Sequence, residues 1–203
     1  NCSYLFGSKY ILLNFDFFNY RNRKDFPKNI KNNNMHLFFG TNDQSGYTIR
    51  FSKLILKFFP EISLKIAISG EFLFYYELEK LSKKYKNRLN WKSDINNMAS
   101  HMFECSYAIG SPGMSTWERL CMGLPTMHLT NTKLQINVLK LLKKSGICEY
   151  LGHASEITDN EFVSGLKSFL ENKSKLMKMR EIGLTEIDGQ GINRVTNYIL
   201  NEL

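Results

Sequence analysis

GSPGMSTWERLCMGLPT, residues 110–126, is the stretch that decides the fold. It follows a short apolar run, residues 107–110, and leads into a second apolar run, residues 125–129. Glycine lets the backbone adopt positive φ angles, and the hydroxyl of Ser115 or Thr116 can cap a helix that begins just after them. The stretch therefore predicts a strand, a tight turn and a helix, followed directly by another strand.

Similar apolar runs recur along the chain, and segments of helical period lie between them. Repeated alternation of strand and helix indicates a parallel sheet covered by helices. We therefore expect a single α/β Rossmann-like domain, in which a mainly parallel sheet of about six strands is flanked by helices. The expected strands are residues 35–40, 64–68, 89–91, 107–109, 126–129 and 149–151, and the last three helices are expected near residues 159–170, 174–182 and 192–200.

The first part of the chain, residues 1–30, mixes aromatic and basic side chains. We interpret it as a connector that packs on an apolar surface, and residues 31–203 as the Rossmann-like domain. The chain begins with Asn1 rather than Met, and its first residues resemble the middle of a protein. We therefore expect an N-terminal domain of the same polypeptide to precede it.

The composition, with 43% hydrophobic and 23% charged residues among 203, is typical of soluble globular proteins. No apolar run reaches the roughly eighteen residues of a membrane-spanning helix, and no secretory signal pattern is present. We expect a cytoplasmic protein without stable membrane insertion. The widely spaced cysteines show no C-x-x-C motif and no accompanying histidine cluster, so we expect neither a zinc site nor a disulfide framework. They are Cys2, Cys105, Cys121 and Cys148.

The net charge favours an anionic partner, because 27 Lys+Arg outnumber 19 Asp+Glu and give a formal charge of +8. Charge alone does not choose between nucleic acid, a membrane surface and a phosphorylated small molecule. Nucleic acid ranks last, because the aromatic side chains fall in strands and helix faces rather than between basic residues.

Two glycine-containing loops follow expected strands, residues 40–46 and 110–116. In an open parallel sheet, ligands bind outside the carboxyl ends of the strands, where helix N-termini favour phosphate. Neither loop matches the dinucleotide or ATP-binding patterns. A turn of this kind is structural as often as it is a binding loop, so both interpretations stay open at this level.

Three further side chains near the second loop have two interpretations each. Glu118, one turn into the expected helix, can accept hydrogen bonds from a ribose diol or can simply favour the helix dipole. Gln135 and Asn137 can bond phosphate or sugar hydroxyls, or can cap the next helix. His36 and His128 lie in strand-like runs, where a satisfied core histidine is the usual role. We assign no catalytic residue, no metal ligand and no cofactor.

An ordered set of motifs covers nearly the whole chain. The segments are SPGMSTWERLCMGLPTMHL, then LQINVLKLLKKSGICEYLG, and finally IDGQGINRVTNYIL, with LFFGTNDQSGYT before them. This succession resembles the C-terminal half of the UDP-sugar hydrolase of pseudaminic acid biosynthesis and of related spore-coat polysaccharide proteins. That family is similar in architecture to GT-B glycosyltransferases, in which two Rossmann-like halves face each other across a cleft.

The resemblance implies that this chain binds UDP or a UDP-sugar. The loop after residue 110 would hold the diphosphate, Glu118 the ribose, and the edge at Trp91 and Met98 would lie near uracil. The family's water-activating histidine is expected in the N-terminal half, so the isolated chain would not turn over. The implied nucleotide-binding residues are Gly40, Thr41, Asn42, Trp91, Met98, Gly110, Ser111, Gly113, Met114, Ser115, Thr116, Glu118, Gln135 and Asn137.

Three functions remain in competition at the level of sequence. The first is the nucleotide-binding half of a UDP-sugar hydrolase, similar to UDP-2,4-diacetamido-2,4,6-trideoxy-altropyranose hydrolase, in nonulosonic acid or surface polysaccharide biosynthesis. The second keeps the GT-B architecture and transfers a glycosyl group. The third is a non-catalytic module fused to a sugar-nucleotide enzyme such as a cytidylyltransferase.

Overall fold

Six parallel strands form the centre of the molecule, in the order β3-β2-β1-β4-β5-β6. The structure is a computed structural model and describes residues 4–202. Each expected strand is present with ends shifted by a few residues. The strands are β1 (Asn34–Phe38), β2 (Ser63–Ile68), β3 (Leu89–Ser93), β4 (Tyr107–Gly110), β5 (Thr126–Thr130) and β6 (Glu149–His153).

All strands run parallel, but the side of the sheet on which successive strands are added reverses once, between β3 and β4. From β1 the chain builds outward through β2 to β3, then returns to place β4 on the other side of β1 and continues to β5 and β6. In the pairing of β1 with β4, Met35 lies opposite Tyr107 and Phe38 lies opposite Gly110. This is the strand order of the doubly wound Rossmann fold, and the crevice at its reversal point is the usual ligand site.

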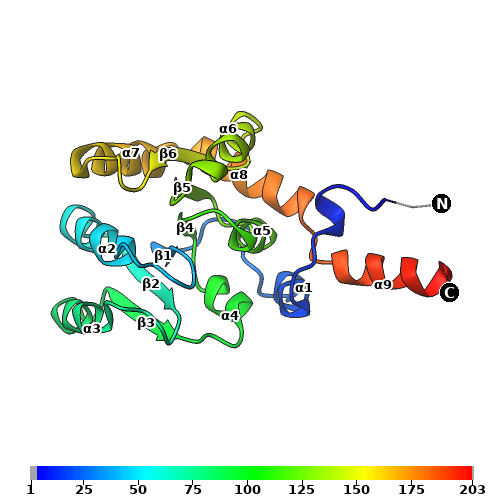
Figure 1. The fold of residues 1–203 in the computed structure, drawn as a ribbon, viewed down its shortest axis with the longest axis horizontal. Helices are drawn as coiled ribbons and strands as arrows, with labels where there is room; N and C mark the ends of the chain where they lie inside the picture. The colour runs from blue at the N-terminus through cyan, green and yellow to red at the C-terminus, as the bar shows by residue number, and fades with distance from the viewer. Residues whose placement is uncertain (1–3, 203) are drawn as a thin grey trace.

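Helices cover both faces of the sheet (Figure 1). One face carries α2 (Tyr47–Phe58), α3 (Tyr75–Lys84) and α7 (Asp159–Glu171), and the other carries α1 (Phe15–Arg21), α4 (Met98–Phe103) and α5 (Met114–Cys121). The remaining elements are η1 (Ser8–Tyr10), η2 (Lys133–Gln135), α6 (Ile136–Lys144), α8 (Lys173–Glu186), which contacts both α7 and α5, and α9 (Gly191–Glu202), which extends beside η1.

The two faces of the sheet differ in chemistry because side chains alternate along each strand. Met35, Leu37, Ile66 and Ile109 are almost fully buried in the larger apolar core, on the side of α2 and α7. The intervening positions face α4 and α5, where the core is smaller and includes Ala108. That second face also carries buried polar side chains, which become important at the site.

The segment expected to be a connector is part of the domain where the structure describes it, from Tyr4 onward. Leu13 and Phe17 are buried in the smaller core. Arg21 donates hydrogen bonds to the carbonyls of Cys121 and Ile187. These contacts attach α1 to α5 and to the end of α8. The further expectation that this segment links to an N-terminal domain stays a prediction.

The cysteines of the described residues are buried free thiols, namely Cys105, Cys121 and Cys148, whereas Cys2 lies outside the described residues. Burial raises the pKa of Cys105 to about 12 and that of Cys121 to about 11. Within residues 4–202 no cluster of His, Cys, Asp and Glu is arranged to hold a metal ion, and no helix is both long and apolar enough to cross a bilayer.

Gly110 is required by the packing of β4 against β1. A Cβ atom at Gly110 would lie 1.8 Å from the carbonyl oxygen of Phe38, so the backbone would have to move. We expect Gly110→Ala to lower the free energy of unfolding by about 3 kcal/mol, measured by urea denaturation. The control is Gly165→Ala in α7, where the nearest atom is the flexible end of the Leu151 side chain. A change within about 1 kcal/mol is expected there, and equal losses at both positions would contradict the backbone argument.

Candidate functional site

Two loops meet at the point where the strand order reverses. We call residues 40–46, between β1 and α2, the β1 loop, and residues 111–113, between β4 and α5, the β4 loop. The backbone amide of Ser111 donates to the carbonyl of Phe38 at 3.3 Å, and a Cβ atom at Gly40 would lie 3.7 Å from the Ser111 hydroxyl. The loops therefore lie side by side at the carboxyl edge of the sheet, where doubly wound folds bind ligands.

The β4 loop delivers the chain into the N-terminus of α5. Gly113 has a φ of 156°, and its amide donates to the hydroxyl of Thr116 at 3.3 Å. The first turn of α5 contains no acidic residue. The amide of Thr116 donates to the Gly113 carbonyl at 3.0 Å. The amides before it have no acceptor within the helix, so this N-terminus carries positive partial charge.

At the N-terminus of α2, a carboxylate from the β1 loop accepts hydrogen bonds from the helix amides. Asp43 is buried, and its carboxylate accepts hydrogen bonds from the amides of Tyr47 at 3.0 Å and Thr48 at 2.6 Å. A protein carboxylate thus occupies the position that a bound anion would take at α2. Of the two helix N-termini at the reversal point, α5 is the one left available for an anion.

A buried polar layer lies beneath the two loops, between the sheet and helices α4 and α5. Arg119 of α5 has no exposed surface, and its guanidinium donates to the carbonyls of Phe38 at 3.0 Å and Ser111 at 3.3 Å. Nδ1 of His128 lies 3.1 Å from the Gly110 carbonyl. Burial lowers the pKa of Arg119 to about 10, so its side chain stays positive at neutral pH.

The histidines of this layer are neutral. His36 and His128 are fully buried and His101 nearly so. Burial, then the charge of Arg119, lowers the pKa of His128 to about 3 and that of His36 well below its usual range, and burial lowers that of His101 to about 4. The expected core location of His36 and His128 is confirmed. The expectation that their ring nitrogens are hydrogen-bonded is not met at His36, where neither nitrogen has a partner among the described residues.

Glu118 lies at the edge of this site. Its side chain is half-buried, and burial raises the pKa of its carboxyl group. Its carboxylate forms no hydrogen bond or ion pair with the residues that the structure describes. A partly desolvated carboxylate with free acceptor positions is suited to a hydroxyl-bearing ligand.

Gln135 is used within the protein. Its Oε1 accepts from the amide of Asn131 at 3.2 Å, and its Nε2 donates to the carbonyl of Pro112 at 3.2 Å. It therefore connects the chain after β5 to the β4 loop and holds that loop in place. Asn137 is exposed on the first turn of α6.

The remaining residues implied by the family resemblance are not all close together. Trp91 belongs to the α2 and α3 face, where its ring packs against Tyr75 with centroids 4.9 Å apart. Met98 packs against the smaller core on the opposite face. The proposed uracil edge therefore has its two named side chains on different faces of the sheet. Gly40 lies beside the β4 loop, whereas the carbonyl of Thr41 accepts from the hydroxyl of Ser69, which follows β2, at 2.6 Å.

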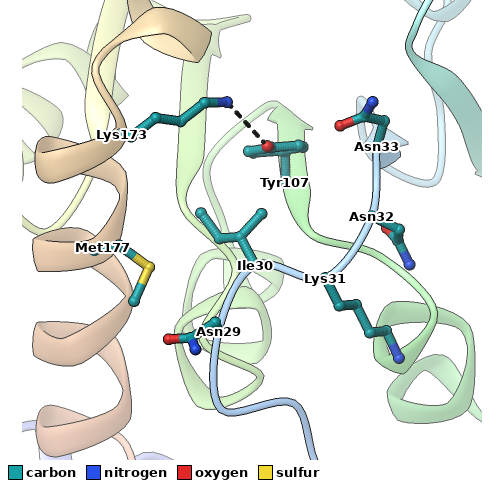
Figure 2. A pocket seen from close by; sticks show the side chains of 8 residues that line it. All are labelled: Asn29, Ile30, Lys31, Asn32, Asn33, Tyr107, Lys173 and Met177. Atoms are coloured by element: carbon teal, nitrogen blue, oxygen red, sulfur yellow. Dashed lines mark hydrogen bonds between the residues drawn. The ribbon is translucent and has the colours of Figure 1, made fainter.

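Two hollows lie at opposite ends of the sheet. One, of about 280 Å³, adjoins the β4 loop between α5 and α6, and its largely apolar lining includes Pro112, Met114, Trp117, Leu134 and Val138. The other, of about 400 Å³, lies where β1 and β4 begin (Figure 2). There Lys173 points to the Tyr107 hydroxyl at 3.5 Å while Lys31 points away. The second hollow is remote from the two loops.

Comparison with known proteins agrees with this fold. No family model matches the chain. The chain is 29% identical over 137 residues to the uncharacterized protein MJ1062 of Methanocaldococcus jannaschii, covering 65% of this chain and 28% of that protein. It is 27% identical over 127 residues to the spore coat polysaccharide biosynthesis protein SpsG of Bacillus subtilis, covering 62% and 37%.

Solved structures resemble the chain over most of its length. MurG of Acinetobacter baumannii matches with a TM-score of 0.64 and 17% identity, over 96% of this chain and 55% of that one. The UDP-GlcNAc 2-epimerase of Neisseria meningitidis, bound to UDP-GlcNAc, matches with a TM-score of 0.59 and 14% identity. This match covers 86% of this chain and 45% of the epimerase chain. The expected fold is thus confirmed as a GT-B-like Rossmann domain, and the chain spans about half or less of the proteins it matches.

The neutral histidines predict a pH dependence of stability. Their folded pKa values lie below the unfolded value, so the unfolded chain takes up more protons as the pH falls below about 6.5. The free energy of unfolding should therefore be highest above pH 6.5 and decrease toward pH 5, by about 1.4 kcal/mol per pH unit for each ring. Urea denaturation at a series of pH values measures this slope.

His128→Gln removes one of the three buried rings, so it should reduce the slope of unfolding free energy against pH by about 1.4 kcal/mol per pH unit. The control is His153→Gln, which leaves the three buried rings in place. Stability that stays constant from pH 7 to pH 5 in the unmodified protein would show that the rings are not held neutral.

Proposed function

We propose that the chain is the nucleotide-binding half of a UDP-sugar hydrolase that acts in nonulosonic acid or surface polysaccharide biosynthesis. The observation that carries the proposal is the uncompensated N-terminus of α5 at the reversal point of the sheet. Asp43 neutralises the neighbouring helix, whereas α5 has no acidic residue in its first turn. A diphosphate supplies the anion that this position favours.

The other parts of the nucleotide are assigned by their chemistry. Glu118 lies one turn into α5, where its carboxylate is half-buried and has no hydrogen-bond partner among the described residues. This carboxylate accepts hydrogen bonds from the ribose hydroxyls. Gly113 and Ser111 bring the backbone of the β4 loop next to the diphosphate. Gln135 acts indirectly by holding the Pro112 carbonyl, and Asn137 is exposed and free to contact the sugar.

The proposed reaction is hydrolysis of the bond between the sugar and the diphosphate, with release of UDP. The amides of the β4 loop and of the first turn of α5 stabilise the negative charge of the leaving diphosphate. The described histidines other than His153 are buried, so they do not serve as the base that activates water. We assign that base to a second domain of the same polypeptide. The likeness to a spore coat polysaccharide biosynthesis protein supports the pathway.

Glycosyl transfer is the second candidate, and the apolar hollow beside the β4 loop favours it. Exposed Met114, Leu134 and Val138 surround this hollow and suit an apolar acceptor. The solved relatives also include a glycosyltransferase of kitacinnamycin and the spinosyn rhamnosyltransferase SpnG. Incubation of the full-length protein with a UDP-sugar separates the two reactions, since hydrolysis releases free sugar without an acceptor.

Removal of the Glu118 carboxylate should weaken nucleotide binding. We expect Glu118→Ala to raise the dissociation constant for UDP about tenfold, because hydrogen bonds to a charged group contribute roughly 1.5–3 kcal/mol. Isothermal titration calorimetry measures the constant. The matched control is Glu77→Ala, which removes another carboxylate from the beginning of a helix, α3. Absence of binding at millimolar UDP in the folded full-length protein would refute the proposal, and equal weakening by both variants would reduce Glu118 to a general charge effect.

A further inference from the structure

A buried positive charge that forms no ion pair with the described residues lies directly beneath the β4 loop. Arg119 has no exposed surface. Among the described residues, its guanidinium donates hydrogen bonds to two backbone carbonyls, those of Phe38 and Ser111. No carboxylate of the described residues forms an ion pair with it. Burial of a charge without a partner is costly, so this arrangement calls for a compensating group.

The neighbouring side chains compensate the charge only in part. Nε of Arg119, both ring nitrogens of His36 and Nε2 of His101 and His128 are buried without a hydrogen-bond partner among the described residues. These rings are neutral, so they supply no negative charge. Glu118 directly precedes Arg119 in the helix, and its carboxylate attracts the guanidinium electrostatically, but the two side chains form no hydrogen bond or ion pair. Glu118 therefore offsets the charge of Arg119 without direct contact.

The field is directed at the candidate anion site. The guanidinium bonds the carbonyl of Ser111, which belongs to the β4 loop, and Gly110 leaves space for it: a Cβ atom there would lie 2.7 Å from Nη2 of Arg119. A charge in the protein interior is screened less by water and salt than a surface lysine. Arg119 and the N-terminus of α5 thus act on the same position above the loop.

We propose that Arg119 sets the charge preference of this site, acting through the β4 loop as a positioning residue for the ligand's diphosphate. The diphosphate adds a counter-charge to the one that Glu118 supplies without direct contact. The inference rests on the proposed function but assigns a role to a residue that does not touch the ligand. It also requires that the effect of Arg119 grow with the number of phosphates.

A series of ligands and two variants test this role in the full-length protein. Arg119→Gln keeps an NH₂ donor group and removes the charge, whereas Arg119→Lys keeps the charge and removes the forked geometry. We expect Arg119→Gln to leave the dissociation constant for uridine unchanged, to raise that for UMP by several-fold and to raise that for UDP by roughly 10- to 100-fold. A Coulomb interaction between partly buried charges implies effects of this size. Arg119→Lys should stay within about threefold of the unmodified protein for UDP.

The controls separate charge from loop support and from the proposed function itself. If the Gln variant binds UDP as well as the unmodified protein, or if both variants lose UDP equally, Arg119 acts as a tether and the inference is overturned. Thermal melting and circular dichroism check folding, and failure of both variants to fold would assign Arg119 to the fold alone. If the unmodified protein binds none of the three ligands, the proposed function fails instead.

Discussion

The close approach of β4 to β1 at the reversal point of the sheet is the constraint on which the site depends. The carbonyl of Phe38 accepts hydrogen bonds from the Ser111 amide and from the Arg119 guanidinium. Only glycine at position 110 leaves room for both. This single carbonyl therefore fixes where β4 ends, how the β4 loop turns and where α5 begins.

Charge compensation distinguishes two helices that are otherwise equivalent in the topology. Both α2 and α5 begin at the carboxyl edge, next to the reversal point. Asp43 closes the N-terminus of α2 with its own carboxylate. At α5 the protein places a cation beneath the loop and leaves the helix amides above it without an acid. Under the proposed function, selectivity for an anion at α5 and not at α2 would follow from these few side chains rather than from the fold.

Much of the architecture could be predicted from the sequence because it is encoded locally. Apolar runs separated by helical segments predict the sheet, and the expected strand at 64–68 corresponds to Ser63–Ile68. Sequence also indicated the two loops, since glycines follow the strands. The expected cap at Ser115 or Thr116 was wrong, because α5 begins at Met114 with Gly113 as its N-cap residue. The helix α1 was missed because its apolar side chains, such as Phe17, pack on α5 and α4, which lie far away in sequence.

The buried polar layer could not be predicted in the same way. Arg119 occupies a helix position that, without knowledge of its neighbours, is equally compatible with solvent. Its burial depends on Phe38, some 80 residues earlier in the chain, whose carbonyl it contacts. One local signal was available: His36 and His128 interrupt strands that are otherwise apolar. The sequence indicated burial of these rings, but only the packing of β1, β5 and α5 shows that they surround a cation.

This layer departs from the packing that the rest of the domain follows. The face toward α2 and α7 buries a larger and mainly apolar core, although the hydroxyl of Ser52 in α2 is also buried there without a partner among the described residues. The face toward α5 buries a cation and three neutral rings with several nitrogens unpartnered among the described residues. Each such group lowers stability relative to an apolar side chain of similar size. Departures of this kind concentrate at functional sites, where local stability is exchanged for chemistry. Arg180 of α8 is also buried with its Nε unpartnered among the described residues, so burial of such a group alone does not mark a binding site. The proposed anion site above the β4 loop would relate the cost of this layer to ligand binding.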